Sequence, residues 1–232
     1  MSVTQTRTES GTATACWSCG AASGGAHFCP ACGKIQPLPR GTSYFAFFGL
    51  PEKLQIDAEA LEQQFHKLSW KLHPDNFMRS SEYERNLSLE RSSELNDAYR
   101  ALRDPLARVE YLLANRGARN EGTTKQQAPP ELLEEVFELN ESLDELREAR
   151  QSGDDLSALR AKLESAEQDF QEKLGDVDAE LDRVRSEWDT ALAANGGSDA
   201  QQKLMAKMNE ILNRRSYIRN LVANVAKELA EA

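Results

Sequence analysis

The stretch that decides the fold is residues 57–105, DAEALEQQFHKLSWKLHPDNFMRSSEYERNLSLERSSELNDAYRALRDP. Apolar residues recur in its first part at steps of three and four, which predicts a helix that Asp57 caps and that ends at Leu72. The proline of the His-Pro-Asp tripeptide disfavours the helical conformation of the residue before it, so the helix has to stop there. A second helix is predicted over 82–103. The stretch is therefore a helical hairpin with the tripeptide at its tip.

More helices are predicted after the hairpin. Pro105 begins a short one that ends near Gly117. Three longer ones follow over residues 131–150, 156–194 and 199–230, and glycines separate them. The apolar residues of the second of these form a single stripe, and three amphipathic helices with short connections predict an antiparallel three-helix bundle. An extended coiled-coil dimer is the alternative architecture.

All four cysteines lie in two C-x-x-C pairs, Cys16-Trp-Ser-Cys19 and Cys29-Pro-Ala-Cys32. A two-residue gap lets both thiolates of a pair turn towards one ion, and four thiolates complete the tetrahedron that Zn²⁺ prefers. The segment is too short to bury a core, so metal binding would also be its folding step. We predict a structural Zn²⁺ site at Cys16, Cys19, Cys29 and Cys32, with the nearby His27 as a bystander.

Two disulfides or a redox-active C-x-x-C pair are the alternatives for these cysteines. Disulfides are rare in proteins that are not secreted, and the first fifteen residues lack the apolar core of a secretion signal. A redox pair normally belongs to an α/β domain, which the helical pattern does not predict. A closed four-cysteine site has no open coordination position, so zinc here would be structural and not catalytic.

Charge and composition limit the partners and divide the chain into segments. The net charge is −10, and residues 121–232 hold 25 acidic but only 14 basic side chains, which phosphates would repel. No stretch approaches the ~18 consecutive apolar residues of a membrane span. We therefore expect neither a nucleic-acid nor a membrane partner. We expect an all-α protein with a disordered tail (1–15), a zinc-binding segment (16–40), a hairpin domain (41–120), a linker (121–130) and a helical bundle (131–232).

The hairpin resembles a J-domain, the module through which co-chaperones activate DnaK-type heat-shock ATPases. The position of the tripeptide between two amphipathic helices carries this resemblance, and further motifs strengthen it: Tyr44-Phe45, Asn96-Asp97-Ala98-Tyr99 and Tyr111-Leu112-Leu113. With the acidic helical segment that follows, the chain resembles the HscB-type J-proteins of iron–sulfur cluster assembly. The cysteine pairs, with Trp17 and Phe28-Cys29-Pro30, resemble the zinc-bearing N-terminus of some members.

The resemblance implies that the tip binds a DnaK/HscA-type heat-shock ATPase. Asp75 offers a carboxylate to a basic group, Pro74 makes the turn rigid, and His73 can donate and accept hydrogen bonds. A pre-organised turn reduces the ordering cost of docking. Lys67 and Lys71, one turn apart on the first helix, would steer the protein towards an acidic ATPase surface. The alternative for the tripeptide is a purely structural turn that caps the helix.

The first bundle helix carries more apolar surface than one stripe requires. Leu133 and Phe137 lie outside the stripe, on the side of three glutamates. From composition, a broad core contact and a partner surface explain this equally well. In HscB-type proteins this helix and an aromatic residue of the last helix dock the IscU-type iron–sulfur scaffold protein. The resemblance thus implies a scaffold-binding set of Leu133, Glu134, Phe137, Glu138, Glu141 and Tyr217.

The implied function is that of a non-enzymatic co-chaperone. It would bind the scaffold, bring it to a specialised DnaK/HscA-type chaperone and stimulate ATP hydrolysis there, which promotes cluster transfer and protein maturation. The sequence has no Gly-rich phosphate loop with which to hold ATP itself. The alternatives are a general J-protein that delivers unfolded clients and a thiol oxidoreductase. The expected location is the cytoplasm, or the mitochondrion in a eukaryote.

Overall fold

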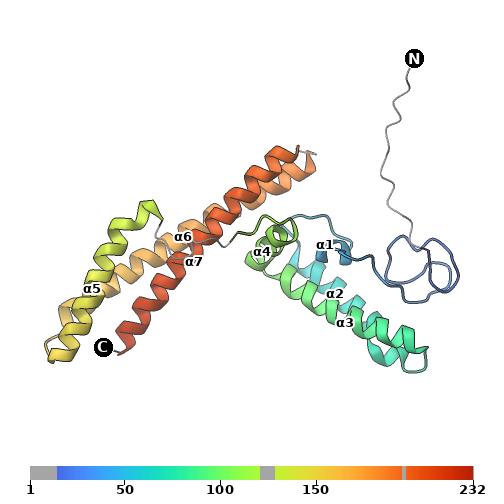
Figure 1. The fold of residues 1–232 in the computed structure, drawn as a ribbon, viewed down its shortest axis with the longest axis horizontal. Helices are drawn as coiled ribbons and strands as arrows, with labels where there is room; N and C mark the ends of the chain where they lie inside the picture. Colours follow the sequence, from blue (N-terminus) through green and yellow to red (C-terminus); the bar gives the residue numbers. More distant parts are fainter. Residues whose placement is uncertain (1–14, 121–128, 195–196, 232) are drawn as a thin grey trace, which may run out of the picture. The chain divides into compact units, whose positions relative to one another are not determined.

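Figure 1 shows the computed structural model of the chain, which describes residues 15–120, 129–194 and 197–231. The predicted all-α class is confirmed, because the described ranges are built from helices and contain two isolated β-bridges near the N-terminus in place of a sheet. Within these ranges no helix has both the length and the apolar character that crossing a membrane requires. Nearly all of the predicted tail (1–15) and linker (121–130) lies outside the described residues.

The chain divides into two compact units. Among the described residues, the first contains those up to Glu52 together with Ile56–Arg108, and the second contains Lys53–Gln55 together with those from Val109 onward. The four cysteines and the His-Pro-Asp tripeptide therefore belong to one unit. The predicted bundle belongs to the other.

The first unit is organised around the predicted hairpin. Helices α2 (Ala58–Leu72) and α3 (Glu82–Arg103) lie side by side and antiparallel, joined by the 3₁₀ helix η1 (Pro74–Phe77) (Figure 1). Both helices have the bounds that the sequence predicts. The carboxylate of Asp57 accepts hydrogen bonds from two backbone N–H groups of the first turn of α2, at 3.0 and 3.1 Å, which confirms the predicted N-cap.

The core of this unit lies between the apolar faces of the two helices. The short helix α1 (Tyr44–Phe47) adds two buried phenylalanines to it. The rings of Phe65 and Tyr99 stack across the hairpin with their centroids 4.2 Å apart. Helix α4 (Pro105–Asn115) begins at the proline, as predicted, and its residues from Val109 onward belong to the second unit. The buried apolar residues of α1, α2 and α3 are Phe45, Phe47, Leu61, Leu68, Leu72, Leu87, Leu95, Ala98 and Leu102.

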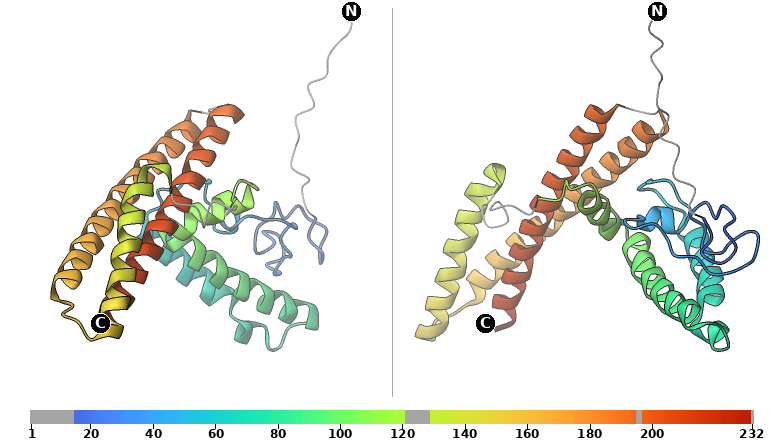
Figure 2. Two further views of the ribbon diagram at one scale, coloured as in Figure 1. Left: turned by 60° about the vertical axis from the view of Figure 1, so that its left-hand side comes forward. Right: turned by 45° about the vertical axis from the view of Figure 1, so that its right-hand side comes forward.

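The second unit contains three long helices: α5 (Leu133–Ser152), α6 (Ser157–Ala193) and α7 (Ser198–Glu231). Helices α6 and α7 lie side by side over most of their length, and α5 lies beside the end of that pair that carries the C-terminus (Figures 1 and 2). The predicted antiparallel three-helix bundle is confirmed. The apolar stripes are buried against helices of the same chain, whereas an extended coiled-coil dimer would bury them against a second chain.

Ion pairs and the buried stripe of α6 hold the bundle together. The residues buried along α6 are spaced by three, four or seven positions, which keeps them on the apolar stripe read from the sequence: Leu163, Phe170, Val177, Leu181, Val184 and Trp188. Ion pairs join α5 to both of its neighbours. Lys173 of α6 lies 3.0 Å from Glu135, and Arg147 lies 2.6 Å from Glu228 of α7.

The short segment Lys53–Gln55 packs on α6. The backbone N–H groups of Leu54 and Gln55 donate to the two carboxylate oxygens of Asp189, at 2.7 and 2.8 Å. The guanidinium of Arg185 donates to the carbonyl of Leu54 at 2.9 Å, and the Leu54 side chain is fully buried. A single aspartate on α6 thus binds a segment that lies more than 130 residues earlier in the chain.

Candidate functional site

The His-Pro-Asp tripeptide projects from the end of the hairpin. His73 Nδ1 accepts a hydrogen bond from the backbone N–H of Asp75 at 3.3 Å, and the Asp75 carboxylate lies 3.5 Å from the same nitrogen. Yet 56% of the His73 side chain and 76% of the Asp75 side chain are exposed. His73 therefore makes a local hydrogen bond within the turn, and the turn presents an imidazole edge and a carboxylate to solvent.

Lys67 and Lys71, the two lysines predicted to accompany the tip, lie one turn apart on α2 and are exposed. They flank the side of the helix opposite to its buried leucines. This side also carries Trp70, which is 76% exposed, and Met78 follows the tip with a similar exposure. The sequence analysis missed both apolar residues. The signal for Trp70 was its register, half a turn away from the buried stripe of α2.

The four cysteines come together in one cluster. Their sulfur atoms all lie within 4.8 Å of one another, and Cys16 lies 3.7 Å from Cys32, as Cys19 does from Cys29. A tetrahedral ion with metal–sulfur bonds of about 2.3 Å requires sulfur–sulfur distances of about 3.8 Å. A disulfide would require about 2.05 Å. The arrangement therefore fits one tetrahedral metal ion and does not fit the two-disulfide alternative.

The acid–base properties of the thiols also suit a cation. The pKa of Cys16 is lowered to about 6: burial opposes ionisation, but backbone N–H groups of Cys19 and Ser18 and the neighbouring thiols favour the thiolate. The pKa of Cys32 is raised to about 12: a backbone hydrogen bond from Lys34 favours the thiolate, but desolvation and the three neighbouring sulfurs together outweigh it. The opposite shifts show that the thiols are not equivalent without an ion, and a bound divalent ion would favour the thiolate form of each ligand.

Local backbone geometry brings each pair of cysteines around the site. Gly20 and Gly33, directly after the pairs, have φ values of +73° and +71°, a region that glycine adopts without strain. Their N–H groups donate to the carbonyls of the first cysteine of each pair, at 3.0 and 2.9 Å. His27 lies outside the cluster, with Nε2 at 2.9 Å from the carbonyl of Phe47. Burial lowers the pKa of this histidine.

On α5, the two apolar residues outside the stripe are exposed. Leu133 is 56% exposed and Phe137 is 70% exposed, whereas the stripe residues Val136, Leu139 and Leu143 are buried. At about 100° per residue, Leu133 and Phe137 point away from this buried stripe. The structure thus decides between the two explanations that composition left open: these side chains are not core.

Carboxylates surround the exposed pair. Glu134 and Glu141 are exposed on the same side of α5, and we call these four residues the α5 patch. Glu138 lies at its edge and lines the groove between α5 and α6. The sequence analysis missed Glu145, which is exposed one turn after Glu141 and extends the patch. The four-residue spacing could have identified it.

Tyr217, the predicted aromatic partner of this face, lies on α7 and is half-buried. Burial raises the pKa of its hydroxyl. One turn earlier, the guanidinium of Arg214 lies 3.4 Å from the carboxylate of Glu131, in the 3₁₀ helix η3 (Pro130–Leu132) that leads into α5. The part of α7 that carries Tyr217 is therefore adjacent to the start of α5, where the α5 patch begins.

Comparisons with known proteins agree with the fold and the site. Residues 128–194 match a family model described as the HSCB C-terminal oligomerisation domain. The co-chaperone protein HscB homolog of Vibrio campbellii is 35% identical over 141 residues, which cover 61% of this chain and 81% of that protein. The homolog of Aliivibrio fischeri is 42% identical over 106 residues, which cover 45% of this chain and 61% of that protein.

A solved structure extends the likeness over nearly the whole chain. The crystal structure of the human co-chaperone protein HscB matches with a TM-score of 0.60 at 25% identity, covering 93% of this chain and 98% of the human one. The resemblance read from the His-Pro-Asp hairpin and the acidic helices is therefore confirmed by sequence and by fold. The chain belongs to the HscB family of co-chaperones.

Proposed function

We propose that this protein binds an IscU-type iron–sulfur scaffold and delivers it to a specialised DnaK/HscA-type chaperone, whose ATPase it stimulates. The observation that carries the proposal is the α5 patch. This patch exposes two large apolar side chains to solvent among carboxylates, and it lies on a different unit from the exposed tripeptide. The chain that carries it belongs to a co-chaperone family. An exposed apolar pair with a polar rim is typical of a partner-binding surface.

In this proposal the ATPase binds the tip of the hairpin. Asp75 contributes an exposed carboxylate, and His73 contributes the Nε2 edge of its ring, because Nδ1 is occupied by the backbone N–H of Asp75. Lys67 and Lys71 add positive charge on the preceding helix and speed the encounter with an acidic surface. No group of this protein contacts the reacting phosphate; its residues bind and orient the enzyme that does.

The scaffold binds the other unit. Phe137 is the anchor, since exposed aromatic residues that become buried dominate the binding energy of many interfaces. Leu133 extends the apolar contact, and Glu134, Glu138 and Glu141 pair with basic groups at its rim. Tyr217 contributes the edge of a half-buried ring from α7. ATP hydrolysis on the chaperone then secures the delivered scaffold and promotes cluster transfer and protein maturation.

The proposal assigns Zn²⁺ to the four-cysteine cluster. The sulfur distances and the four soft donors support this assignment. Cys16, Cys19, Cys29 and Cys32 would fill the coordination sphere, so the ion would supply structural cross-linking and no chemistry. A native protein with one bound Zn²⁺ and thiols that do not react would exclude the oxidoreductase alternative.

Binding measurements test the proposal. Isothermal titration should detect a complex with the folded scaffold and none with a denatured model protein at the same concentration. The result that contradicts it is equal binding to both, which a general J-protein would give. The Phe137→Ala variant should bind the scaffold weakly, which separates use of the α5 patch from binding elsewhere.

A further inference from the structure

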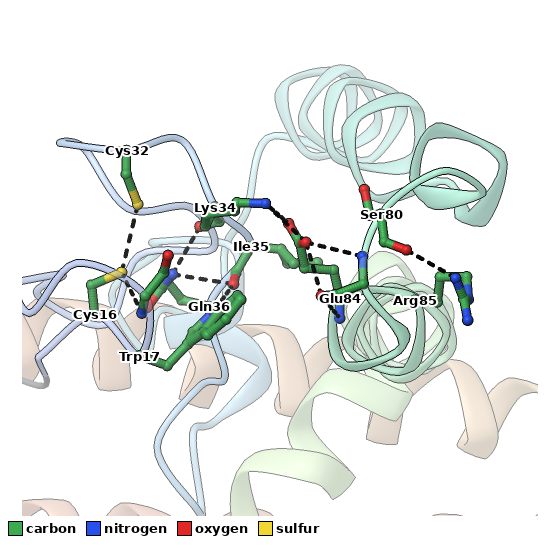
Figure 3. Close-up of polar contacts among 11 residues, drawn as sticks. Cys16, Trp17, Cys32, Lys34, Ile35, Gln36, Ser80, Glu84 and Arg85 are labelled. Carbon is green, nitrogen blue, oxygen red and sulfur yellow. Dashed lines mark hydrogen bonds and ion pairs between the residues drawn. The ribbon is translucent and has the colours of Figure 1, made fainter.

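We propose that the cysteine segment (residues 16–40), once ordered by its metal ion, stabilises the start of α3. Through α3 it also stabilises residues 76–80, which follow the His-Pro-Asp tip. We call the segment in this role the brace. Two side chains of the segment contact α3. Lys34, two residues after the last cysteine, pairs with Glu84 (Figure 3), and Trp17, between the first two cysteines, packs against Tyr83. The expected effect of the brace on ATPase stimulation rests on the proposed function. Its expected effect on the stability of the first turn of α3 does not.

The first contact is an ion pair between Lys34 and Glu84. The ammonium nitrogen of Lys34 lies 2.9 Å from both carboxylate oxygens of Glu84. The Glu84 side chain is only 5% exposed, although it stands in the first turn of a helix that otherwise faces solvent there. A carboxylate that is this deeply buried needs a cationic or hydrogen-bonding partner, and Lys34 is the cation that the structure provides.

The same carboxylate caps α3. Glu84 accepts hydrogen bonds from the N–H and the hydroxyl of Ser81, at 3.3 and 2.9 Å, and the Ser81 hydroxyl accepts one from the N–H of Glu84. These bonds form the capping box that starts the helix. Lys34 therefore fixes the rotamer of a residue on which the N-terminus of α3 depends. Removing Lys34 leaves the capping carboxylate buried without its charged partner.

The second contact is aromatic. The rings of Trp17 and Tyr83 meet edge to face with centroids 4.9 Å apart, and the Trp17 indole N–H donates to the carbonyl of Ile35 at 2.7 Å. Ile35 is fully buried. Trp17 lies within the C-x-x-C loop of the first pair, so the metal that closes this loop also positions the ring. Both contacts thus depend on a segment that has little core of its own.

The brace reaches the tip through the chain that returns from it. The N–H of Ser80, next to the cap residue Ser81, donates to the carbonyl of Phe77 at 2.9 Å. The carbonyl of Ser80 accepts from the Arg85 guanidinium at 2.8 Å (Figure 3). Phe77, the last residue of η1, is buried. The start of α3 and the residues directly after the His-Pro-Asp tripeptide are therefore joined by hydrogen bonds on both sides of Ser81.

Amide hydrogen exchange on the full-length chain tests the brace without any partner. The samples are the zinc-loaded wild type, the wild type stripped by a chelator under reducing conditions, and the variants Lys34→Ala and Lys34→Arg. The exposed Lys207→Ala of α7 is the matched control. We expect the amides of Glu84 and Arg85 to exchange about fivefold faster after stripping or in Lys34→Ala, the effect of losing a helix cap. Lys34→Arg and Lys207→Ala should match the wild type, and Zn²⁺ should restore the stripped sample.

Two results would overturn the proposal. Unchanged exchange at Glu84 and Arg85 in both the stripped protein and Lys34→Ala would mean that the segment does not support α3. Faster exchange there with unchanged exchange over residues 76–80 would mean that the support ends before the tip. The zinc content of Lys34→Ala, expected to equal that of the wild type, shows that its effect comes from the lost ion pair and not from an unfolded segment.

The exchange result also separates this inference from the proposed function. If the wild type fails to stimulate the chaperone while its exchange depends on zinc and on Lys34, the brace stands and the proposed function fails. If the wild type stimulates, Lys34→Ala should stimulate less and Lys34→Arg should restore the effect. Equal stimulation by Lys34→Ala and the wild type would contradict a positioning role for Lys34.

Discussion

The hydroxyl of Ser88 donates a hydrogen bond to the carbonyl oxygen of Leu72 at 2.7 Å, and the hydroxyl of Ser92 donates a second one at 2.9 Å. Leu72 is the last residue of α2, where the carbonyls lack partners within the helix. Two side chains of α3 therefore cap the end of α2 directly before His73. This contact fixes the point from which the tripeptide leaves the hairpin.

Replacing both serines by alanine should destabilise the protein. The Ser88 side chain is fully buried, so the Leu72 carbonyl would lose its partners in a place with little access to water. We expect a loss of about 1–3 kcal/mol in the free energy of unfolding, measured by urea denaturation. Ser93→Ala, at an exposed position of the same helix, is the control and should change little. Equal stability of the double variant and the control would contradict the capping role.

His73→Gln should abolish ATPase stimulation while leaving the melting temperature unchanged. More than half of this side chain is exposed, and glutamine can still accept the hydrogen bond from the backbone of Asp75. Circular dichroism gives the helicity and the melting temperature, and a single-turnover assay gives the stimulation. Unfolding of the variant would show instead that the tripeptide serves the structure of the turn.

Phe137→Ala should weaken scaffold binding at least about tenfold, as expected for an aromatic anchor. Because the side chain is 70% exposed, the free energy of unfolding should change by less than about 0.5 kcal/mol. Leu143→Ala, from the buried side of the same helix, is the opposite case and should cost about 2–5 kcal/mol. A large loss of stability in Phe137→Ala would place the ring in the core and remove its docking role.

The pH dependence of the bundle's free energy of unfolding should depend on Glu228. Hydrogen bonds from the Arg147 guanidinium, aided by the charge of Arg150, lower the pKa of this carboxyl although burial opposes them. A lowered pKa stabilises the folded state fully above the ordinary value of about 4.3, and the contribution is lost as the pH falls through the folded-state pKa. Urea denaturation between pH 7 and pH 3 measures this contribution to the free energy of unfolding.

Glu228→Gln should therefore be less stable than the wild type by about 1–3 kcal/mol at neutral pH. The difference should remain constant down to about pH 4.5 and then shrink. Glu187→Gln, at an exposed position of α6, controls for the lost negative charge. A difference that is the same at pH 7 and pH 3 would show that the ion pair with Arg147 does not act through the ionised carboxylate.

The helices could be predicted because their signals are local. Helix α3 has the predicted bounds, since Ser81 and Glu84 form a capping box and Pro105 begins the next helix. The start of α5 differs from the prediction by two residues: Glu131 lies in a 3₁₀ turn and the α-helix begins at Leu133. A period of three to four residues does not distinguish these two helix types over a single turn.

Contacts between distant parts of the chain could not be predicted. The Lys34–Glu84 pair joins residues 50 positions apart, and Asp189 binds a segment 135 positions away. Neither has a pattern in the sequence, because any exposed lysine or aspartate would look the same. For Phe137, periodicity fixed its side of α5, but only the packing of α6 and α7 determined that this side faces solvent.

The most direct test of the account is the single-turnover rate of ATP hydrolysis by the cognate DnaK/HscA-type chaperone, measured with this protein, with the folded scaffold and with both. We expect the two together to accelerate hydrolysis far beyond either one alone, because the tip and the α5 patch then act on one complex. Equal acceleration by this protein with and without the scaffold would contradict it.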